Sequence, residues 1–200
     1  GVDPKLGTNP MSIAIPAGTH PPLVLDMATS VVARGKIILA AKQGLPIPEG
    51  WALTKDGLPT TDADAAMEGT SLPFGGPKGY GIGLANDILS GVLSGAFYGS
   101  LLNSLWDNFE EPQNVGFFMG AINIAAFADP IEFGQKLDAY FDEIKSGRKA
   151  PGTKEILIPG EIELRAEERF SKEGVAIPAA VVSELLELSQ TYQVEFPLKV

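Results

Sequence analysis

The sequence of 200 residues is 44% hydrophobic and 20% charged, which allows one domain with a full apolar core, or one domain with a small accessory piece. The formal net charge of −10 and the absence of a Lys/Arg cluster argue against a nucleic-acid partner. The chain has no cysteine, which excludes disulfides, thiolate metal sites and cysteine nucleophiles. This composition is compatible with the cytoplasm, where we expect the protein.

The first quarter of the chain predicts two strands followed by a helix. Short apolar runs at residues 11–15 and 23–25 predict the strands. Asp26 is expected to be the N-cap of a helix that ends near Gly44. The apolar face of this helix is expected to contain Val31, Val32, Ile38 and Leu39.

The middle of the chain predicts a long loop and then a helix. Residues 45–77 are rich in Pro, Gly, Thr and Asp and predict an extended loop, with one short strand near 51–53. Beyond Lys78, apolar residues recur every three or four positions, which predicts a helix whose N-terminus lies in a glycine-rich run. The uncharged segment 88–106 contains too much Gly and Ser for a membrane span, so we expect a buried, closely packed helix there.

The clearest element of the second half is an amphipathic helix. Before it, the continuous apolar run 117–127 predicts a strand buried on both faces. Asp129 and the capping pattern that follows it predict a helix over 129–144, with its stop at Gly147.

The last quarter predicts one strand and two helices. The strand is expected at 156–158, a charged helix at about 163–172, and a final helix beginning at Pro178. The alternation of strands and helices predicts an α/β fold with a mixed, largely antiparallel sheet and flanking helices.

Lys78 lies in the glycine-rich run, which differs from the familiar phosphate-binding motifs. Pro77 and Gly79 flank the lysine, so the Walker pattern is absent. Gly79, Gly81 and Gly83 form G-x-G-x-G, which does not match the Rossmann fingerprint G-x-G-x-x-G. Free backbone N–H groups, a helix N-terminus and one ammonium group would suit an anion. A glycine-rich turn with an exposed lysine explains the same spacing.

Other polar residues carry weaker signals. His20 is the only histidine and has no carboxylate or serine beside it in sequence, so we expect a surface residue. One histidine and no cysteine cannot assemble a histidine triad or a histidine-rich metal site. Asp56, Asp62 and Asp64 lack EF-hand spacing and predict a solvated acidic loop. Asp26 has two compatible interpretations, as an N-cap and as a ligand for a ribose hydroxyl.

Six short motifs follow one another along the chain: Gly7-Thr8-Asn9-Pro10, Leu25-Asp26-Met27-Ala28-Thr29-Ser30, Gly35-Lys36, Asp56-Gly57-x-Pro59-Thr60-Thr61-Asp62, Gly76-Pro77-Lys78-Gly79-Tyr80-Gly81 and Leu89-Ser90-Gly91-Val92-Leu93. In order and spacing they resemble the malate/L-lactate dehydrogenase-like family. Six motifs in register are far more specific than one glycine loop, and the resemblance runs through nearly the whole chain.

This resemblance implies an NAD(P)-dependent dehydrogenase that interconverts a malate- or lactate-like 2-hydroxy acid and a 2-oxo acid, in a fold that is not Rossmann. The cofactor is either NAD or NADP. The cofactor-binding residues implied by the motifs are Asp26, Met27, Ala28, Lys78, Gly160, Glu161 and Ile162. Thr8 is expected to contact the substrate. No catalytic and no metal-binding residue is assigned within this chain.

Members of the family are longer, and an upstream region supplies a Ser-His-Gly segment and the histidine that exchanges a proton with the substrate hydroxyl. Neither is present in this sequence, so we expect part of the active site outside it and a homodimer or a complementing N-terminal chain as partner. Residues 1–150 are expected to form part of the NAD(P)-binding domain, and 151–200 to pack on the missing region or on a partner subunit.

Three alternatives remain compatible with the sequence. The chain could be a non-catalytic cofactor-binding fragment. It could be a structural or interaction module. It could also belong to a cyclic imino acid reductase of the same family.

Overall fold

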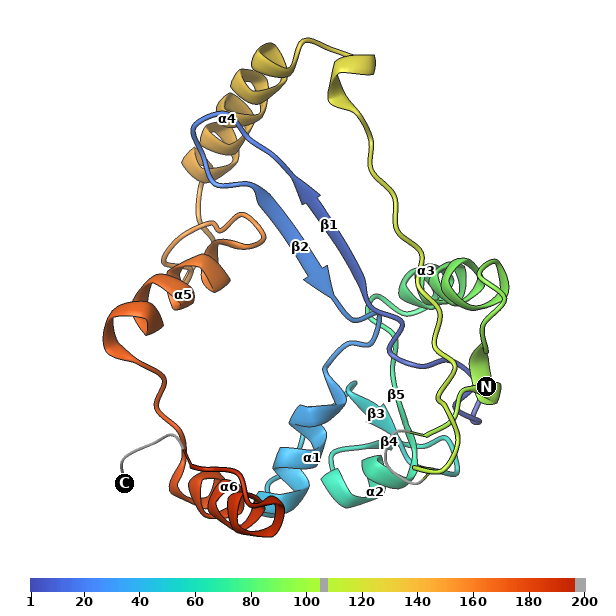
Figure 1. Cartoon of the computed structure of the whole chain (residues 1–200). Helices are drawn as coiled ribbons and strands as arrows, with labels where there is room; N and C mark the ends of the chain where they lie inside the picture. The colour runs from blue at the N-terminus through green and yellow to red at the C-terminus, as the bar shows by residue number, and fades with distance from the viewer. Residues whose placement is uncertain (105–107, 197–200) are drawn as a thin grey trace. The chain divides into compact units, whose positions relative to one another are not determined.

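A computed structural model of the chain describes residues 1–104 and 108–196. The chain divides into two compact units, residues 1–160 and residues 161–200, and each is described by itself. The elements are coloured in chain order in Figure 1.

A β-hairpin begins the first unit. Strand β1 (Met11–Ile15) pairs antiparallel with β2 (Leu23–Met27), in a register that places Ser12 opposite Asp26. Asp26 is therefore a strand residue with an exposed side chain, and its prediction as an N-cap is wrong. The strand prediction from the apolar runs is confirmed.

Helix α1 (Arg34–Gln43) follows the hairpin. Its N-cap is Ala33, which makes no side-chain capping bond, and Val31 and Val32 precede the helix. Gly44 ends the helix in the left-handed conformation with φ 63°, as predicted for its C-terminus. The helix therefore begins later than predicted and ends where predicted.

The segment predicted as a long loop folds into a small second sheet with a helix. The sheet has the order β4-β3-β5, formed by Pro59–Thr60, Ala52–Leu53 and Thr70–Ser71, and both pairings are antiparallel. Helix α2 (Ala63–Glu68) begins at Asp62, whose carboxylate accepts hydrogen bonds from the first-turn N–H groups. Asp62 is thus a helix N-cap and Asp64 lies in the first turn, so the predicted acidic loop is wrong at these two residues, although both are exposed to solvent as expected.

This region also contains the apolar core of the first unit. The buried side chains that pack together are Val32, Ile37, Ile47, Ala52, Ala63 and Ala66. They come from α1, α2, β3 and the connections between them, so this small core holds α1 and α2 against the β4-β3-β5 sheet.

Helix α3 (Pro77–Asp87) begins in the glycine-rich run, as predicted, and continues into one π-helical turn at Ile88–Val92. The helix predicted over 88–106 therefore ends early within the described residues, and Leu93, which was predicted to be buried, is exposed; residues 105 and 106 lie outside the described part of the chain. A 3-10 turn at Gly99–Leu101 follows. No helix within the described residues is long and apolar enough to cross a membrane.

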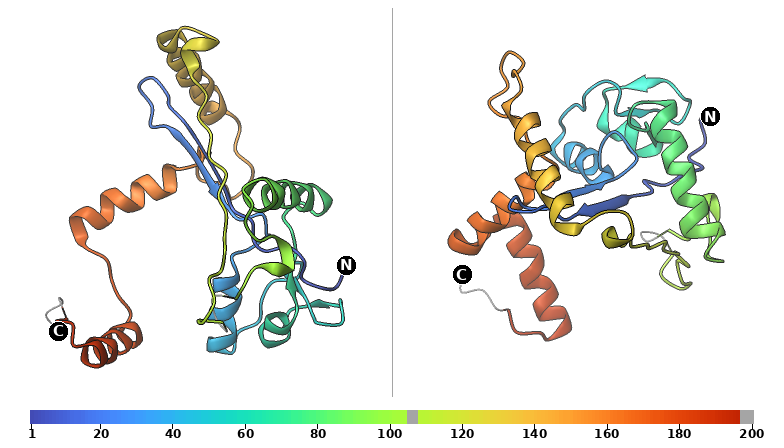
Figure 2. Two further views of the ribbon diagram at one scale, coloured as in Figure 1. Left: turned by 45° about the vertical axis from the view of Figure 1, so that its right-hand side comes forward. Right: turned by 90° about the horizontal axis from the view of Figure 1, so that it is seen from above.

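The apolar run 117–127 is not a paired strand in this chain. Its first part is an extended segment without strand partners among the described residues, and Ile124–Ala126 form a 3-10 turn. Helix α4 (Pro130–Ser146) then follows with Asp129 as its N-cap, as predicted. Figure 2 shows α4 beside the turn of the β1–β2 hairpin in both views.

The predicted strand at 156–158 is absent, although Ile158 is buried. The second unit consists of helices α5 (Glu161–Glu173) and α6 (Ala179–Tyr192). Helix α5 begins two residues before its predicted start, and α6 follows Pro178 as predicted. The fold is thus mixed α/β with flanking helices, but in the described part of the chain two small antiparallel sheets replace the single mixed sheet that was expected.

Candidate functional site

Thr29 is the centre of a junction between three segments of the first unit. Its backbone N–H donates to the carbonyl of Thr8 at 2.8 Å, and its hydroxyl donates to the same carbonyl at 2.9 Å. Its own carbonyl accepts from the N–H of Phe74 at 3.0 Å. Thr29 is only 4% exposed, so these bonds form away from bulk water and hold the segments firmly.

Asn9 and Asn86 extend the junction to helix α3. The side-chain amide of Asn9 donates to the carbonyl of Gly83 at 2.9 Å, and the amide of Asn86 donates to the carbonyl of Asn9 at 3.0 Å. Gly83 also lies against Thr29, because a Cβ built on this glycine would lie 2.9 Å from the Thr29 hydroxyl oxygen. The segment containing Thr8 is therefore fixed against both α3 and the end of β2.

The turn before α3 requires glycine at two successive positions. Gly75 and Gly76 have φ values of 57° and 62°, in the left-handed region that side chains disfavour. Gly79 is buried, and a Cβ at this position would collide with the backbone carbonyl of Phe74. The glycines thus place the helix N-terminus directly beside the strand segment that Phe74 contacts.

Lys78 lies in the first turn of α3, with an exposed side chain. No described residue pairs with its ammonium group or accepts from its backbone N–H. The N-cap, Gly76, offers no side-chain oxygen to these first-turn donors. An open helix N-terminus with one free cation is the donor set that suits a phosphate group.

Gly160 lies against the free edge of β2. The N–H of Val24 donates to the carbonyl of Pro159 at 2.9 Å, and a Cβ on Gly160 would lie 3.0 Å from the Val24 Cβ. Gly160 has φ 99°, so this tight turn again favours glycine. Glu161 and Ile162 are the first two residues of α5 and belong to the second unit.

The structure thus brings several predicted site residues together and leaves others apart. Thr8 contacts Thr29 directly, and the residues before Thr29, Met27 and Ala28, lie at the partly buried end of β2. Lys78 lies in the first turn of the helix that packs on this junction. Asp26 projects from β2 with its carboxylate exposed and makes no hydrogen bond with a described residue.

His20 lies at the other end of the hairpin. Its Nε2 is 3.0 Å from an oxygen of Asp142 on α4, and its ring meets Phe141 edge-on. The sequence shows no carboxylate beside His20, but the fold brings Asp142 to it from 122 residues further along the chain, and the His20 side chain is partly exposed. Four strand steps from Leu23 to Met27 alone measure roughly 13 Å, so His20 does not lie at the Thr29 junction.

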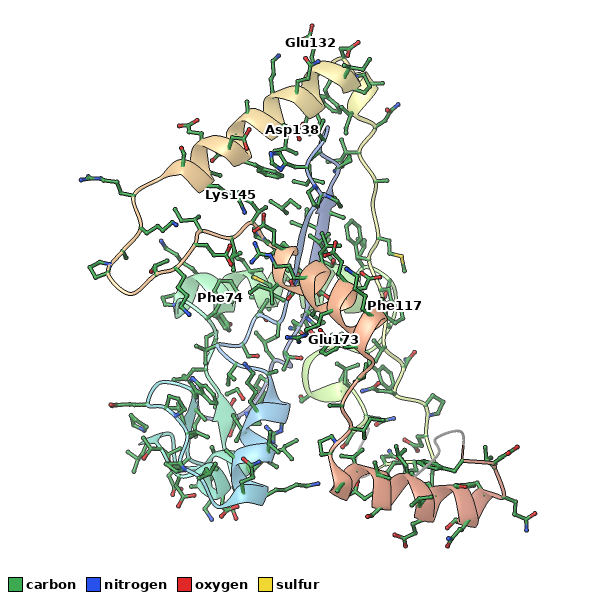
Figure 3. All side chains as sticks on the ribbon, turned by 90° about the vertical axis from the view of Figure 1, so that its left-hand side faces the viewer. Phe74, Phe117, Glu132, Asp138, Lys145 and Glu173 are labelled. Atoms are coloured by element: carbon green, nitrogen blue, oxygen red, sulfur yellow. The ribbon has the colours of Figure 1, made fainter. Side chains whose placement is uncertain are left out.

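Asp138 holds the same turn against α4 (Figure 3). Its carboxylate accepts from the N–H groups of Gly18, Thr19 and His20 at 3.0, 2.6 and 3.2 Å, and from the Thr19 hydroxyl at 2.8 Å. These bonds, with the N–H of Thr19 as the largest cause, lower the pKa of Asp138 from 3.8 to about 2, against an opposing effect of desolvation. These hydrogen bonds join the hairpin turn at Gly18, Thr19 and His20 to α4, a contact that we call the latch, and the N–H groups of the turn are therefore not available to a ligand.

Two residues of the junction were missed as site candidates, Thr29 and Asn9. Both lie inside the motifs Gly7-Thr8-Asn9-Pro10 and Ala28-Thr29-Ser30. Their position inside these two motifs was the available signal. Within residues 1–104 and 108–196, no group of three or more His, Cys, Asp or Glu side chains could hold a metal ion.

Comparison with known proteins gives consistent matches along the chain. The sulfolactate dehydrogenase of Methanocaldococcus jannaschii has a similar structure, with a TM-score of 0.81 and 42% identity, covering 98% of this chain and 55% of that one. A (2R)-3-sulfolactate dehydrogenase (NADP(+)) of Chromohalobacter salexigens is 38% identical over 92% of this chain and 53% of its own length. A ureidoglycolate dehydrogenase (NAD(+)) of Escherichia coli is 36% identical over 88% of this chain and 50% of its own length.

The chain spans about half the length of these relatives. The family model for malate/L-lactate dehydrogenase matches residues 1–186, which include the junction, the glycine turn and Gly160. The chain therefore belongs to the malate/L-lactate dehydrogenase family.

Proposed function

We propose that this chain forms the nicotinamide-cofactor-binding part of an NAD(P)-dependent dehydrogenase that interconverts a 2-hydroxy acid and a 2-oxo acid. The observation that carries the proposal is the open N-terminus of α3, where no described residue pairs with the ammonium group of Lys78, in a helix held at the end of β2 through Thr29. Relatives named for NAD(+) and for NADP(+) support the nicotinamide cofactor.

Each site residue has a role that its position supports. The phosphates of the dinucleotide bind at the first turn of α3, where Lys78 supplies the positive charge. The exposed carboxylate of Asp26 accepts a hydrogen bond from a ribose hydroxyl, and Met27 and Ala28 provide the adjoining surface. Thr8 contacts the substrate or the nicotinamide from the segment that is bonded to Thr29.

The turn at Gly160 belongs to the first unit and contributes to the proposed cofactor site, and the sequence motif also proposes Glu161 and Ile162, the first residues of the second unit, as cofactor ligands. Its support is the close packing of Gly160 on Val24, two residues from Asp26 along the same strand. A side chain at position 160 would push this turn away from β2.

The bound cofactor would supply the hydride chemistry, and the protein must supply a group that exchanges the hydroxyl proton. The chain has one histidine, and its Nε2 is paired with Asp142 at the hairpin turn. We propose that the proton-exchanging group comes from polypeptide outside this chain, either a complementing N-terminal region or a partner subunit. The active site is then complete only in that assembly.

The strand pairing supports a fold that differs from Rossmann. The Rossmann dinucleotide site needs a parallel βαβ unit, whereas every strand pair in the described part of the chain is antiparallel. The glycine turn before α3 also follows β5 of a small antiparallel sheet. The cofactor therefore binds a helix N-terminus in a different topological setting.

Titration of the full chain with NADH and NADPH, followed by cofactor fluorescence, tests this proposal. We expect saturable binding of one or both nucleotides. Lys78→Ala should raise the Kd by about 10- to 100-fold, because a hydrogen bond to a charged group contributes about 1.5–3 kcal/mol. Lys42→Ala, an exposed lysine in the last turn of α1, is the matched control and should bind normally. A folded chain that binds neither nucleotide would refute the proposal.

A further inference from the structure

Asn9 has a backbone conformation that its own sequence disfavours. Its φ of 34° lies in the left-handed region, which is uncommon for residues other than glycine, although asparagine tolerates it better than most. Pro10 follows directly, and a proline normally forces the preceding residue into an extended conformation with negative φ. Interactions with the rest of the fold must therefore hold Asn9 in this conformation.

Two side-chain amides hold Asn9 against helix α3. The amide of Asn9 donates to the carbonyl of Gly83 at 2.9 Å, and the amide of Asn86 donates to the carbonyl of Asn9 at 3.0 Å. Gly83 and Asn86 are three residues apart, so they lie on the same face of the helix. Figure 1 shows the segment before β1 passing α3. We call these two hydrogen bonds the asparagine clamp.

The asparagine clamp is not needed to attach this segment to the fold. One residue before Asn9, the carbonyl of Thr8 already accepts two hydrogen bonds from Thr29, at 2.8 and 2.9 Å. Two residues after Asn9, Met11 pairs with Met27 in the β1–β2 hairpin. A disfavoured backbone conformation persists only where the surrounding structure enforces it, and such residues concentrate at functional sites. The clamp therefore sets the direction of the chain, which the other bonds already attach.

The residue whose direction the clamp sets is Thr8. The bonds to Thr29 fix the peptide unit between Thr8 and Asn9, and the clamp fixes the φ rotation that follows this unit. The side chain of Thr8 is exposed, and its hydroxyl forms no hydrogen bond with a described residue. A hydroxyl on a fixed backbone, with its donor and both acceptor positions free, suits a polar group of a ligand.

We propose that Asn86 is a positioning residue of the cofactor site, which holds Asn9 so that the Thr8 hydroxyl bonds the nicotinamide-nucleoside half of the dinucleotide. This rests on the proposed cofactor function and adds the half of the cofactor that the segment contacts. Gly83 lies five residues after Lys78, about 8 Å along the helix axis, so the segment lies beside the proposed phosphate site.

The chemistry of hydride transfer favours the nicotinamide half over the adenosine half. The nicotinamide ring must be held in one geometry relative to the substrate, whereas the adenosine half supplies affinity. An enforced backbone conformation suits the half that needs a fixed geometry. The carboxamide and ribose hydroxyls of the nicotinamide nucleoside both donate and accept hydrogen bonds, as the Thr8 hydroxyl does.

Binding of NADH and of ADP-ribose to the full chain tests the proposal, because ADP-ribose keeps the pyrophosphate and the adenosine and lacks nicotinamide. If the chain prefers NADPH, this cofactor and the 2′-phosphate of ADP-ribose take their places. Asn86→Ala removes the amide at a position where alanine favours the helix. The Kd for NADH should rise about three- to tenfold, as for one lost neutral hydrogen bond, and the Kd for ADP-ribose should change less than about twofold.

Asn103→Ala is the matched control. The amide of Asn103 also donates to a backbone carbonyl, that of Pro112 at 2.8 Å, in the same unit. This variant should bind both nucleotides normally. Asn86→Asp is a second test variant, because it keeps the shape of the side chain and loses the donor when it is ionised, and it should match Asn86→Ala.

A double-mutant cycle separates positioning from a general structural role. Thr8→Val removes the hydroxyl itself and should weaken NADH binding to the same extent as Asn86→Ala. Its stability should be unchanged, because this hydroxyl has no partner among the described residues. If Asn86 acts through Thr8, adding Asn86→Ala to Thr8→Val should weaken NADH binding no further.

Three results would overturn the inference about Asn86 and leave the proposed function standing. Equal weakening of NADH and ADP-ribose would make its role purely structural. Unchanged NADH binding would remove it from the site. Additive effects in the double variant would disconnect it from Thr8. An unmodified chain that binds neither NADH nor NADPH would overturn both proposals.

Discussion

The two ends of the β1–β2 hairpin use charged groups in opposite ways. At the turn, Asp138 accepts four hydrogen bonds from Gly18, Thr19 and His20, so its capacity is consumed by the chain itself. At the other end, Lys78 has no partner among the described residues, although the backbone around it is fixed by glycines. The carboxylate of Asp138 therefore has a structural role. The ammonium group of Lys78, which no described residue pairs with, has the ligand-binding role that we propose.

The largest expected effect is at the open end, with Gly79→Ala. The added Cβ would meet the backbone carbonyl of Phe74, which cannot move without disturbing its bond to Thr29, so we expect a loss of about 3 kcal/mol in the free energy of unfolding. Chemical denaturation measures it.

Gly81→Ala is the matched control for this substitution. Nothing lies within 4 Å of a Cβ at Gly81, and alanine favours a helix, so a gain of about 0.5–1 kcal/mol is expected. If Gly79→Ala were as well tolerated as Gly81→Ala, the turn would not be rigid and the contrast between the two ends would fail.

A smaller effect compares the same substitution at both ends. Thr29→Val removes a buried hydroxyl that donates to the Thr8 carbonyl at 2.9 Å, and should cost about 1 kcal/mol, because that carbonyl still accepts from the Thr29 N–H. Thr19→Val removes an exposed hydroxyl from Asp138, which keeps three N–H donors, and should cost less. Thermal unfolding of both variants ranks them, and the reverse order would contradict the assignment of Thr29 as the centre of the junction.

Local signals in the sequence were sufficient for elements that are stabilised locally. The Asp129 cap and the apolar spacing after it predicted α4, and the left-handed Gly44 ended α1 where expected. Helix α2 was missed because it has only six residues, and its one clear signal, Asp62, lay in a polar segment. Short helices that depend on a cap and on tertiary packing give no periodicity to detect.

Contacts between distant residues could not be predicted in the same way. The bond between His20 and Asp142 joins positions 122 residues apart, and Thr29 reaches Phe74 across another element. The motifs identified Lys78 and the end of β2, but only the fold shows that Thr29 connects them. The strand predicted at 117–127 illustrates the remaining limit, because an apolar pattern predicts burial without naming the polypeptide that covers it.

The smallest expected effect tests the latch by its pH dependence. The pKa of Asp138 is lowered to about 2 in the folded chain, against 3.8 for an ordinary aspartate, so its contribution to stability is fully present above about pH 4 and is lost as the pH falls toward 2. Asp138→Asn should therefore lower the Tm by a constant amount between pH 6 and pH 4, and by progressively less below pH 4. The carboxylate of Asp138 is partly exposed to solvent, which screens it and keeps the difference modest. A difference that persisted unchanged at pH 2 would show that the charge of Asp138 does not hold the turn, and that shape alone keeps Gly18 against α4.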